Sequence, residues 1–102
     1  MTNTLLLSDN FRLWLNALRD QRGRARILSR IRMAELGNFG DFASVGGGVM
    51  EMRVHDGPGY RLYYVREGET VYLLLAGGDK STQSRDIKSA IALWDEIGKG
   101  NQ

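Results

Sequence analysis

Three β-type segments in the second half of the chain constrain the fold more than any other feature. Residues 49–55, 60–66 and 70–76 are rich in β-branched, aromatic and aliphatic side chains. Asp56-Gly57-Pro58-Gly59 and Glu67-Gly68-Glu69 separate them and are typical of turns. Connections this short join antiparallel neighbours, because a parallel crossover needs about a dozen residues or more. We therefore predict an antiparallel meander of at least three strands.

Helical periodicity occurs on both sides of this meander. A first amphipathic helix, which Ser8 or Asp9 can cap, has an apolar stripe made of Phe11, Trp14, Leu15 and Leu18. A second helix follows residues 21–23 and ends at Gly37-Asn38, and its expected inward side chains are Ile27, Leu28, Ile31 and Leu36. A third helix covers residues 82–97, with one face formed by Ile87, Ala90, Ile91 and Trp94. This order predicts an α+β fold, in which helices cover one face of an antiparallel sheet.

Length and composition exclude several classes of protein. The chain has 102 residues, which predicts a single domain over residues 1–102. It has no cysteine and one histidine, so we expect no disulfide framework, no metal and no cofactor. Leu5-Leu6-Leu7 lacks a basic flank and a long apolar continuation, so neither a signal peptide nor a membrane span is expected. The prediction is a small cytoplasmic protein.

The segment LLLAGGDKSTQSRDI, residues 73–87, contains the parts of a phosphate-binding loop. An apolar run is followed by Gly77-Gly78, then by Lys80-Ser81-Thr82 and a predicted helix. A nucleotide-binding loop needs G-x-x-x-x-G-K-[ST], because backbone amides before the lysine wrap the phosphates. Here Asp79 precedes Lys80, and Leu74 lies where the first glycine is required. The spacing argues against a nucleotide hydrolase, and it leaves open whether the glycine turn and Lys80 bind another phosphate.

Positive charge is concentrated near the start of the chain. Residues 1–32 contain seven arginines and two aspartates, a balance of +5, although the whole chain carries only +2. Arg22, Arg26 and Arg30 recur every four residues, on the expected outer side of the second helix. Such a block indicates a polyanion or an acidic partner. A solvated face without a function is the alternative.

The strand at residues 49–55 places Glu51, Arg53 and His55 on one face, opposite an expected apolar core face. If the following turn has an odd number of residues, Arg53 lies opposite Arg61, and Tyr63 shares their face. Two adjacent arginines repel each other, which indicates a bound anion unless Glu51 neutralises one of them. His55 is either a surface residue or a general base. A tyrosine on the open face could stack on a base.

Taken together, the motifs resemble a known family over residues 11–92. The succession is F-x-x-W-L-x-x-L-R-D, G-N-F-G-D, V-G-G-G-V-x-E-x-R, G-P-G-Y-R-L-Y-Y and L-L-A-G-G-D-K-S-T-Q-x-x-D-I. It resembles the addiction module killer proteins, the HigB-like branch of the RelE/ParE toxin superfamily. The pairing of the G-P-G-Y-R and G-G-D-K-S-T-Q motifs is the most specific part of this resemblance.

The resemblance implies a toxin of a type II toxin–antitoxin module, with two helices followed by an antiparallel sheet and a C-terminal helix. Its relatives cut messenger RNA on the ribosome, which implies mRNA, the ribosome and a helix-turn-helix antitoxin as partners. The implied catalytic residues are Arg53, Arg61 and Lys80. The expected nucleic-acid-binding residues are Arg22, Arg26, Arg30, His55, Tyr63 and Gln83.

This chain departs from several RelE-type nucleases near its end, because no tyrosine or histidine follows Tyr72. His55, Tyr63 or Lys80 would have to act as the acid or base. Two other functions remain open: a ParE-like inhibitor of DNA gyrase, and a non-catalytic module that binds RNA or protein.

Overall fold

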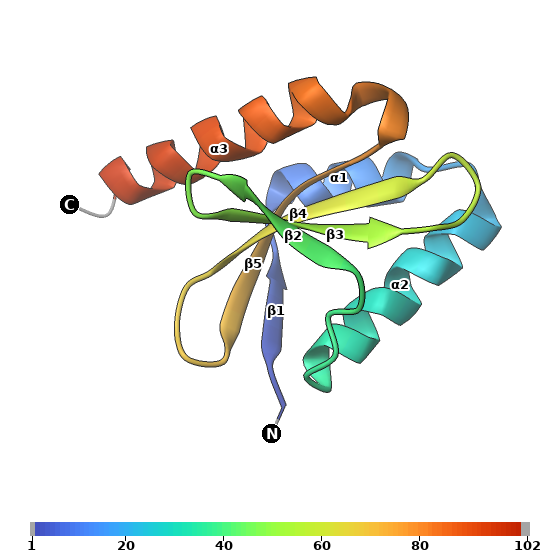
Figure 1. Ribbon diagram of the computed structural model, residues 1–102, viewed down its shortest axis with the longest axis horizontal. Helices are drawn as coiled ribbons and strands as arrows, with labels where there is room; N and C mark the ends of the chain where they lie inside the picture. Colours follow the sequence, from blue (N-terminus) through green and yellow to red (C-terminus); the bar gives the residue numbers. More distant parts are fainter. Residues whose placement is uncertain (1, 101–102) are drawn as a thin grey trace.

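A five-stranded sheet with helices on both faces forms the structure, a computed structural model that describes residues 2–100 (Figure 1). The elements follow in the order β1 (Thr4–Leu7), α1 (Asp9–Ala17), α2 (Gln21–Glu35), β2 (Phe42–Gly46), β3 (Val49–Val54), β4 (Tyr60–Arg66), β5 (Val71–Asp79), a short 3-10 helix (Lys80–Thr82) and α3 (Gln83–Gly100). The strand order is β1-β5-β4-β3-β2.

The predicted meander is confirmed as the centre of this sheet. Strands β3, β4 and β5 pair antiparallel in sequence order. Val54 pairs with Tyr60, so five residues connect β3 and β4, and Arg53 lies directly opposite Arg61. The odd length of this connection therefore puts both arginines on one face of the sheet, as alternation required.

The two edge strands were not predicted, and one of them makes the sheet mixed. Residues 4–7 form β1, which pairs parallel to β5. Strand β2 pairs antiparallel to β3 and ends at Gly46, and Gly47-Gly48 is the turn between the two strands. The φ values of the three successive glycines are 99°, 62° and 82°. The left-handed backbone of these glycines, which glycine adopts without strain, gives the connection a defined geometry. Strand β1 has four residues, and β2 has five and ends at a glycine, so both are too short for the alternation of apolar and polar side chains to identify them.

The expectation that all helices cover one face is wrong. Helices α1 and α2 pack against one face of the sheet through a core that includes Phe11, Ile27 and Leu62. Helix α3 packs against the opposite face, over a second core that includes Tyr63 and Ala90. Strand β4 is buried from Tyr60 to Val65, on both faces, because it lies in the middle of the sheet between two helical layers.

Helices α1 and α2 begin at local caps. The Ser8 side chain accepts a hydrogen bond from the Phe11 amide, which confirms Ser8 as the cap of α1. Asp20 accepts from the Gly23 amide, so α2 begins at Gln21 and not after Gly23.

The inward face of α2 differs from its prediction. Ile27 is buried, whereas Leu28 and Leu36 are exposed. Arg30 is not on the outer side, because its guanidinium donates to the backbone carbonyls of Arg53 and Phe39. The helix is therefore rotated relative to the predicted apolar stripe, and its arginine at position 30 faces the sheet.

Gly77 and Gly78 do not form the predicted glycine turn. Strand β5 continues through both residues to Asp79, with Gly77 opposite Leu62 and Gly78 opposite Arg61. A Cβ at Gly77 would lie 2.2 Å from the Trp14 ring, and one at Gly78 would lie 1.9 Å from an Asp86 oxygen. The glycines thus allow α1 and α3 to approach the strand closely. None of the helices within residues 2–100 has the length and apolar character to span a membrane.

Candidate functional site

An open pocket of about 430 Å³ lies where the β3–β4 connection meets the end of β5. Its lining residues are His55, Asp56, Gly57, Pro58, Gly59, Arg61 and Lys80. Strand pairing explains this arrangement, because Tyr60 and Arg61 at the start of β4 pair with Asp79 and Gly78 at the end of β5. Lys80 follows Asp79 directly, so the strand end carries its ammonium group to the turn.

Arg61 is the most unusual residue of the pocket. Its side chain comes from the middle of the sheet, and the residue is only 7% exposed. The Nε and Nη1 atoms are buried without a hydrogen-bond partner among the described residues. Burying an unpaired cation and unsatisfied N–H groups costs free energy. Arg61 therefore lines the pocket and carries two buried N–H donor atoms that no described residue accepts from.

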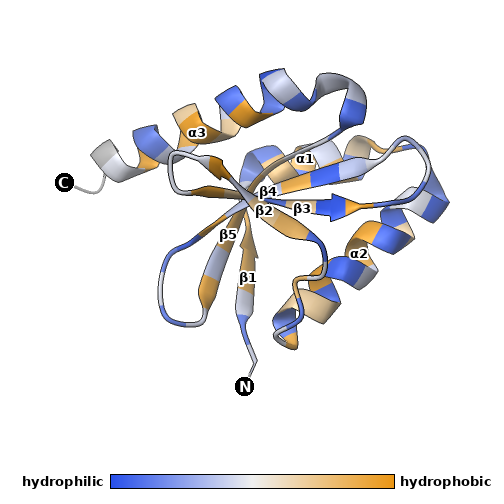
Figure 2. Ribbon diagram, viewed as in Figure 1, coloured by the Kyte–Doolittle hydropathy of each residue, from blue (hydrophilic) through white to orange (hydrophobic). Residues whose placement is uncertain are grey.

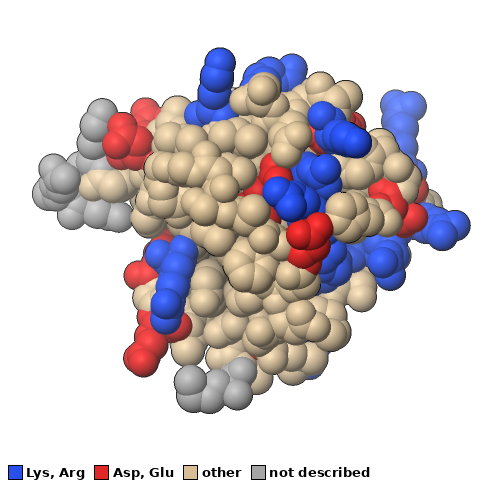
Figure 3. All heavy atoms as spheres, in the orientation of Figure 1, with Lys and Arg blue, Asp and Glu red and all other residues tan. Residues whose placement is uncertain are grey.

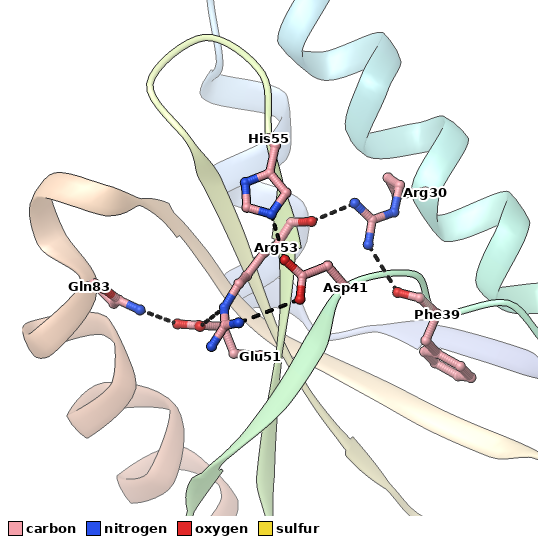
Figure 4. Close-up of polar contacts among 7 residues, drawn as sticks. All are labelled: Arg30, Phe39, Asp41, Glu51, Arg53, His55 and Gln83. Atoms are coloured by element: carbon pink, nitrogen blue, oxygen red, sulfur yellow. Dashed lines mark hydrogen bonds and ion pairs between the residues drawn. The ribbon is translucent and has the colours of Figure 1, made fainter.

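Arg53, directly opposite Arg61, is paired with two carboxylates. Its Nε donates to Glu51 Oε1 at 3.1 Å, and its Nη1 lies 3.4 Å from Asp41 Oδ1 (Figure 4). Glu51 is completely buried and also accepts from Gln83 Nε2 at 2.8 Å. The alternative that Glu51 neutralises one arginine is thus correct for Arg53. It leaves Arg61 without a carboxylate partner among residues 2–100.

His55 forms a pair with Asp41 at the mouth of the pocket. Its Nε2 lies 2.5 Å from Asp41 Oδ2, while most of the ring is exposed to solvent (Figure 4). The hydrogen bond from His55 lowers the pKa of Asp41, and the positive charge of Arg53 lowers it further. An ionised Asp41 requires a proton on Nε2, which leaves Nδ1 as the nitrogen able to exchange protons. The backbone fixes Asp41, because its carbonyl accepts from the Arg53 amide.

Two other predicted residues, Tyr63 and Gln83, lie near Glu51 but do not line the pocket. Tyr63 is opposite Glu51 and completely buried beneath α3, so its ring cannot stack on a base in this arrangement. Burial and the negative charge of Glu51 raise the pKa of the Tyr63 hydroxyl. Gln83, in the first turn of α3, is committed to Glu51. Both residues contact or neighbour Glu51, which pairs with Arg53, and neither lines the pocket.

The arginines of α2 are separated from the pocket to different degrees. Arg22 lies 3.7 Å from Asp56, a residue of the β3–β4 connection, and Arg30 supports the backbone of Arg53. Arg26 is exposed and has no ion pair within the described part of the chain. In Figure 3, lysine and arginine side chains gather on the right of the view, toward the β3–β4 connection and the beginning of α2. Basic side chains therefore extend beyond the pocket.

The sequence did not identify Asp41 as a site residue. Its only indication is the motif G-N-F-G-D, which gives no reason to place Asp41 beside His55 and Arg53. Strand β2 brings it there, since Phe42 pairs with Met52 on β3.

The pocket combines Arg61 and Lys80, two cations that have no carboxylate partner among the described residues, with a histidine oriented by a carboxylate. Such groups can bind an oxyanion and transfer a proton beside it. Within residues 2–100, no three side chains of the metal-ligating types gather in one place.

Comparison with known proteins identifies relatives over nearly the whole chain. Residues 13–95 match the family described as phage derived protein Gp49-like (DUF891). A protein of Haemophilus influenzae is 43% identical over 98 residues, which cover 96% of this chain and 99% of the relative. Its name, "Uncharacterized protein", states no activity.

Proposed function

The chain belongs to the Gp49-like family of phage-derived proteins, toxins of toxin–antitoxin systems related to the RelE and HigB type, and we propose that it cleaves messenger RNA on the ribosome. In this proposal residues 1–102 form a single toxin domain that acts in the cytoplasm. Its antitoxin partner is a helix-turn-helix protein encoded by the neighbouring reading frame.

The observation that carries the proposal is the buried Arg61 guanidinium, whose Nε and Nη1 have no acceptor among the described residues. A phosphodiester supplies oxygens that match an arginine fork, and Lys80 adds a second charge at the same pocket. The cost of burying Arg61 in the free protein is then offset when the phosphate binds. Stability alone gives no reason for an arginine at this position.

The chemistry that fits these groups is transesterification by the neighbouring 2′-hydroxyl of the RNA. The 2′-oxygen attacks the phosphorus and loses its proton to a base, while the P–O5′ bond breaks and the leaving oxygen takes up a proton. The products are a 2′,3′-cyclic phosphate and a free 5′-hydroxyl. His55 Nδ1 serves as the proton-transferring group, held in position by Asp41. Arg61 and Lys80 stabilise the added negative charge on the phosphorus oxygens.

Arg53 has a positioning role in this proposal. Its guanidinium joins Asp41 to Glu51, and its carbonyl accepts from Arg30, so it maintains the geometry that orients His55. A direct contact between Arg53 and the phosphate would require release of both carboxylates. We therefore expect a smaller loss of rate from Arg53→Lys than from Arg61→Lys.

The test is cleavage of a messenger RNA on purified ribosomes, with mapping of the new 5′ ends. Removing one contact to the transition-state charge typically costs a factor of about 10²–10³ in rate. The cleavage rates of the Arg61→Ala and Lys80→Ala variants should therefore fall by that factor. His55→Ala should lose activity and its pH dependence. Lys88→Ala, which removes an exposed lysine of α3 outside this pocket, is the matched control and should cleave normally.

Full cleavage by Arg61→Ala, Lys80→Ala and His55→Ala would show that the site is wrong. Trapping of gyrase–DNA breaks by the wild-type protein, with transcripts intact, would instead favour the ParE-like alternative. Binding of RNA without cleavage would favour a non-catalytic module.

A further inference from the structure

The outward face of α2 exposes large apolar side chains that the fold does not use. Leu28, Met33 and Leu36 are 48%, 40% and 52% exposed, whereas Ile27 and Ala34 on the opposite side of the helix are completely buried. Leu28, Arg32 and Leu36 follow one another at intervals of four positions, so all three lie along one stripe of the helix. Figure 2 shows hydrophobic and hydrophilic residues alternating along α2.

The same helix is strongly basic. Its residues Gln21–Glu35 include Glu35 as the only acidic residue and five arginines: Arg22, Arg24, Arg26, Arg30 and Arg32. Glu35 lies 3.4 Å from Arg32 in an exposed ion pair, which contributes little free energy in water. Arg26 has no ion pair among the described residues. The face that carries Leu28, Met33 and Leu36 thus combines apolar contact area with positive charge.

The chemistry of this face distinguishes between two classes of partner. An RNA backbone would neutralise Arg26 and Arg32 but would leave the leucine and methionine side chains in contact with phosphates and water. An amphipathic helix with acidic residues beside its apolar stripe would cover both. Charge depletion at the centre and a charged rim are typical of protein interfaces.

We propose that the outer face of α2, formed by Arg26, Leu28, Arg32, Met33 and Leu36, is the docking surface for an acidic amphipathic helix of the antitoxin. The antitoxin is implied by the family, so this proposal does not depend on the nuclease activity. The surface differs from the pocket, because α2 packs on the Met52 and Val54 face of β3, whereas Arg53 and Arg61 lie on the other.

The test is the affinity of the purified protein for the product of the neighbouring reading frame, measured by calorimetry. Leu28→Asp/Leu36→Asp should weaken binding roughly 10²-fold or more, because two apolar anchors are lost from the interface. Both residues are exposed, so the melting temperature should stay near that of the wild type. Leu6→Asp is the control. Leu6 is 46% exposed, and it lies on the other face of the sheet from Leu5 and Leu7, which pack against the α1–α2 core. The Leu6→Asp variant should therefore bind the antitoxin normally.

A charge-reversed variant separates the protein partner from RNA. Arg32→Glu should slow antitoxin association severalfold at low salt and leave transcript cleavage unchanged, because Arg32 belongs neither to the pocket nor to the expected RNA-binding residues. Reduced cleavage with unchanged antitoxin binding would assign this face to RNA and overturn the proposal. Equal weakening by Leu6→Asp, or no binding of the neighbouring product by the wild type, would overturn it too. Tight binding that depends on Leu28 and Leu36, with transcripts left intact, would retain the docking surface and reject the nuclease.

Discussion

Arg53 and Arg61 illustrate how two identical residues, paired across two strands, acquire opposite roles. The buried Glu51 carboxylate and Asp41 neutralise Arg53, so its charge contributes to the structure. Arg61 is more deeply buried, yet its Nε and Nη1 lack a partner among the described residues. In the proposed function a bound phosphate offsets this free energy cost, which would make Arg61 an example of the common trade of stability for function.

We predict that Arg61→Met stabilises the free protein while abolishing its activity. A buried polar group without a partner costs about 1–3 kcal/mol, and methionine fills a similar volume without that cost. Arg53→Met should instead lower the free energy of unfolding, because it leaves the buried Glu51 carboxylate without its cation. Urea unfolding of the two variants measures both effects. A loss of stability in Arg61→Met would show that the guanidinium already has a partner in the free protein.

Strand β5 shows how one element can position two helices. Trp14 of α1 lies against Gly77, and Asp86 of α3 lies over Gly78, on either side of the same strand end. Asp86 also accepts from the Thr82 hydroxyl, which connects the start of α3 to the 3-10 helix that contains Lys80. The end of β5 thereby determines where Lys80 stands relative to Arg61.

We predict that Gly77→Ala destabilises the protein, because its Cβ would lie 2.2 Å from the Trp14 ring and force the ring or the strand to move. Such overpacking typically costs about 1–3 kcal/mol. Gly98→Ala is the matched control. Gly98 is in α3, and outside its own helix turn no atom of the described residues lies within 4 Å of an added Cβ, so alanine should stabilise that helix by about 0.5–1 kcal/mol. Thermal unfolding compares them, and an equal effect of both variants would contradict the close contact at Trp14.

At the scale of the whole molecule, tyrosines are buried in both layers of the core. Burial and the hydrogen bond to Asp20 raise the pKa of Tyr60 to about 12. Burial and the neighbouring Tyr72 raise the pKa of Tyr64 to about 12. Tyr63, in the layer beneath α3, is shifted in the same direction by burial and by Glu51. The folded protein therefore holds these protons more tightly than the unfolded chain.

We predict that the contribution of these tyrosines to the free energy of unfolding is complete below pH 10 and is lost as the pH rises from 10 toward 12. The unfolded tyrosines ionise near pH 10, whereas those of the folded state keep their protons, so deprotonation favours unfolding. Each such group contributes a slope of about 1.4 kcal/mol per pH unit. Urea midpoints between pH 8 and 11 test this, and Tyr60→Phe should reduce the slope. A midpoint that stays constant to pH 11 would contradict the burial of all three hydroxyls.

Much of the sheet and part of the site followed from the sequence. The meander and the pairing of Arg53 with Arg61 could be predicted, because turn residues, strand length and alternation are local properties. The Ser8 cap of α1 and the family motifs could be predicted for the same reason, because each depends on neighbouring residues in the chain. Arg61 and Lys80 were expected at one site together with Arg53, and both line the pocket, whereas Arg53 does not. His55 was named as an RNA-binding residue or a general base, and it lines the same pocket.

What the sequence determined by itself was the order of the three long helices and the three central strands, the register of β3 with β4, and the types of residue that carry charge. Tertiary structure decided the rest. It placed α3 on the opposite face from α1 and α2, kept β5 extended through Gly77 and Gly78, and turned Leu28 and Leu36 outward. It also decided which arginine is neutralised, because Asp41 reaches Arg53 only through the pairing of β2 with β3. These outcomes depend on contacts between residues far apart in the chain, which no local pattern encodes.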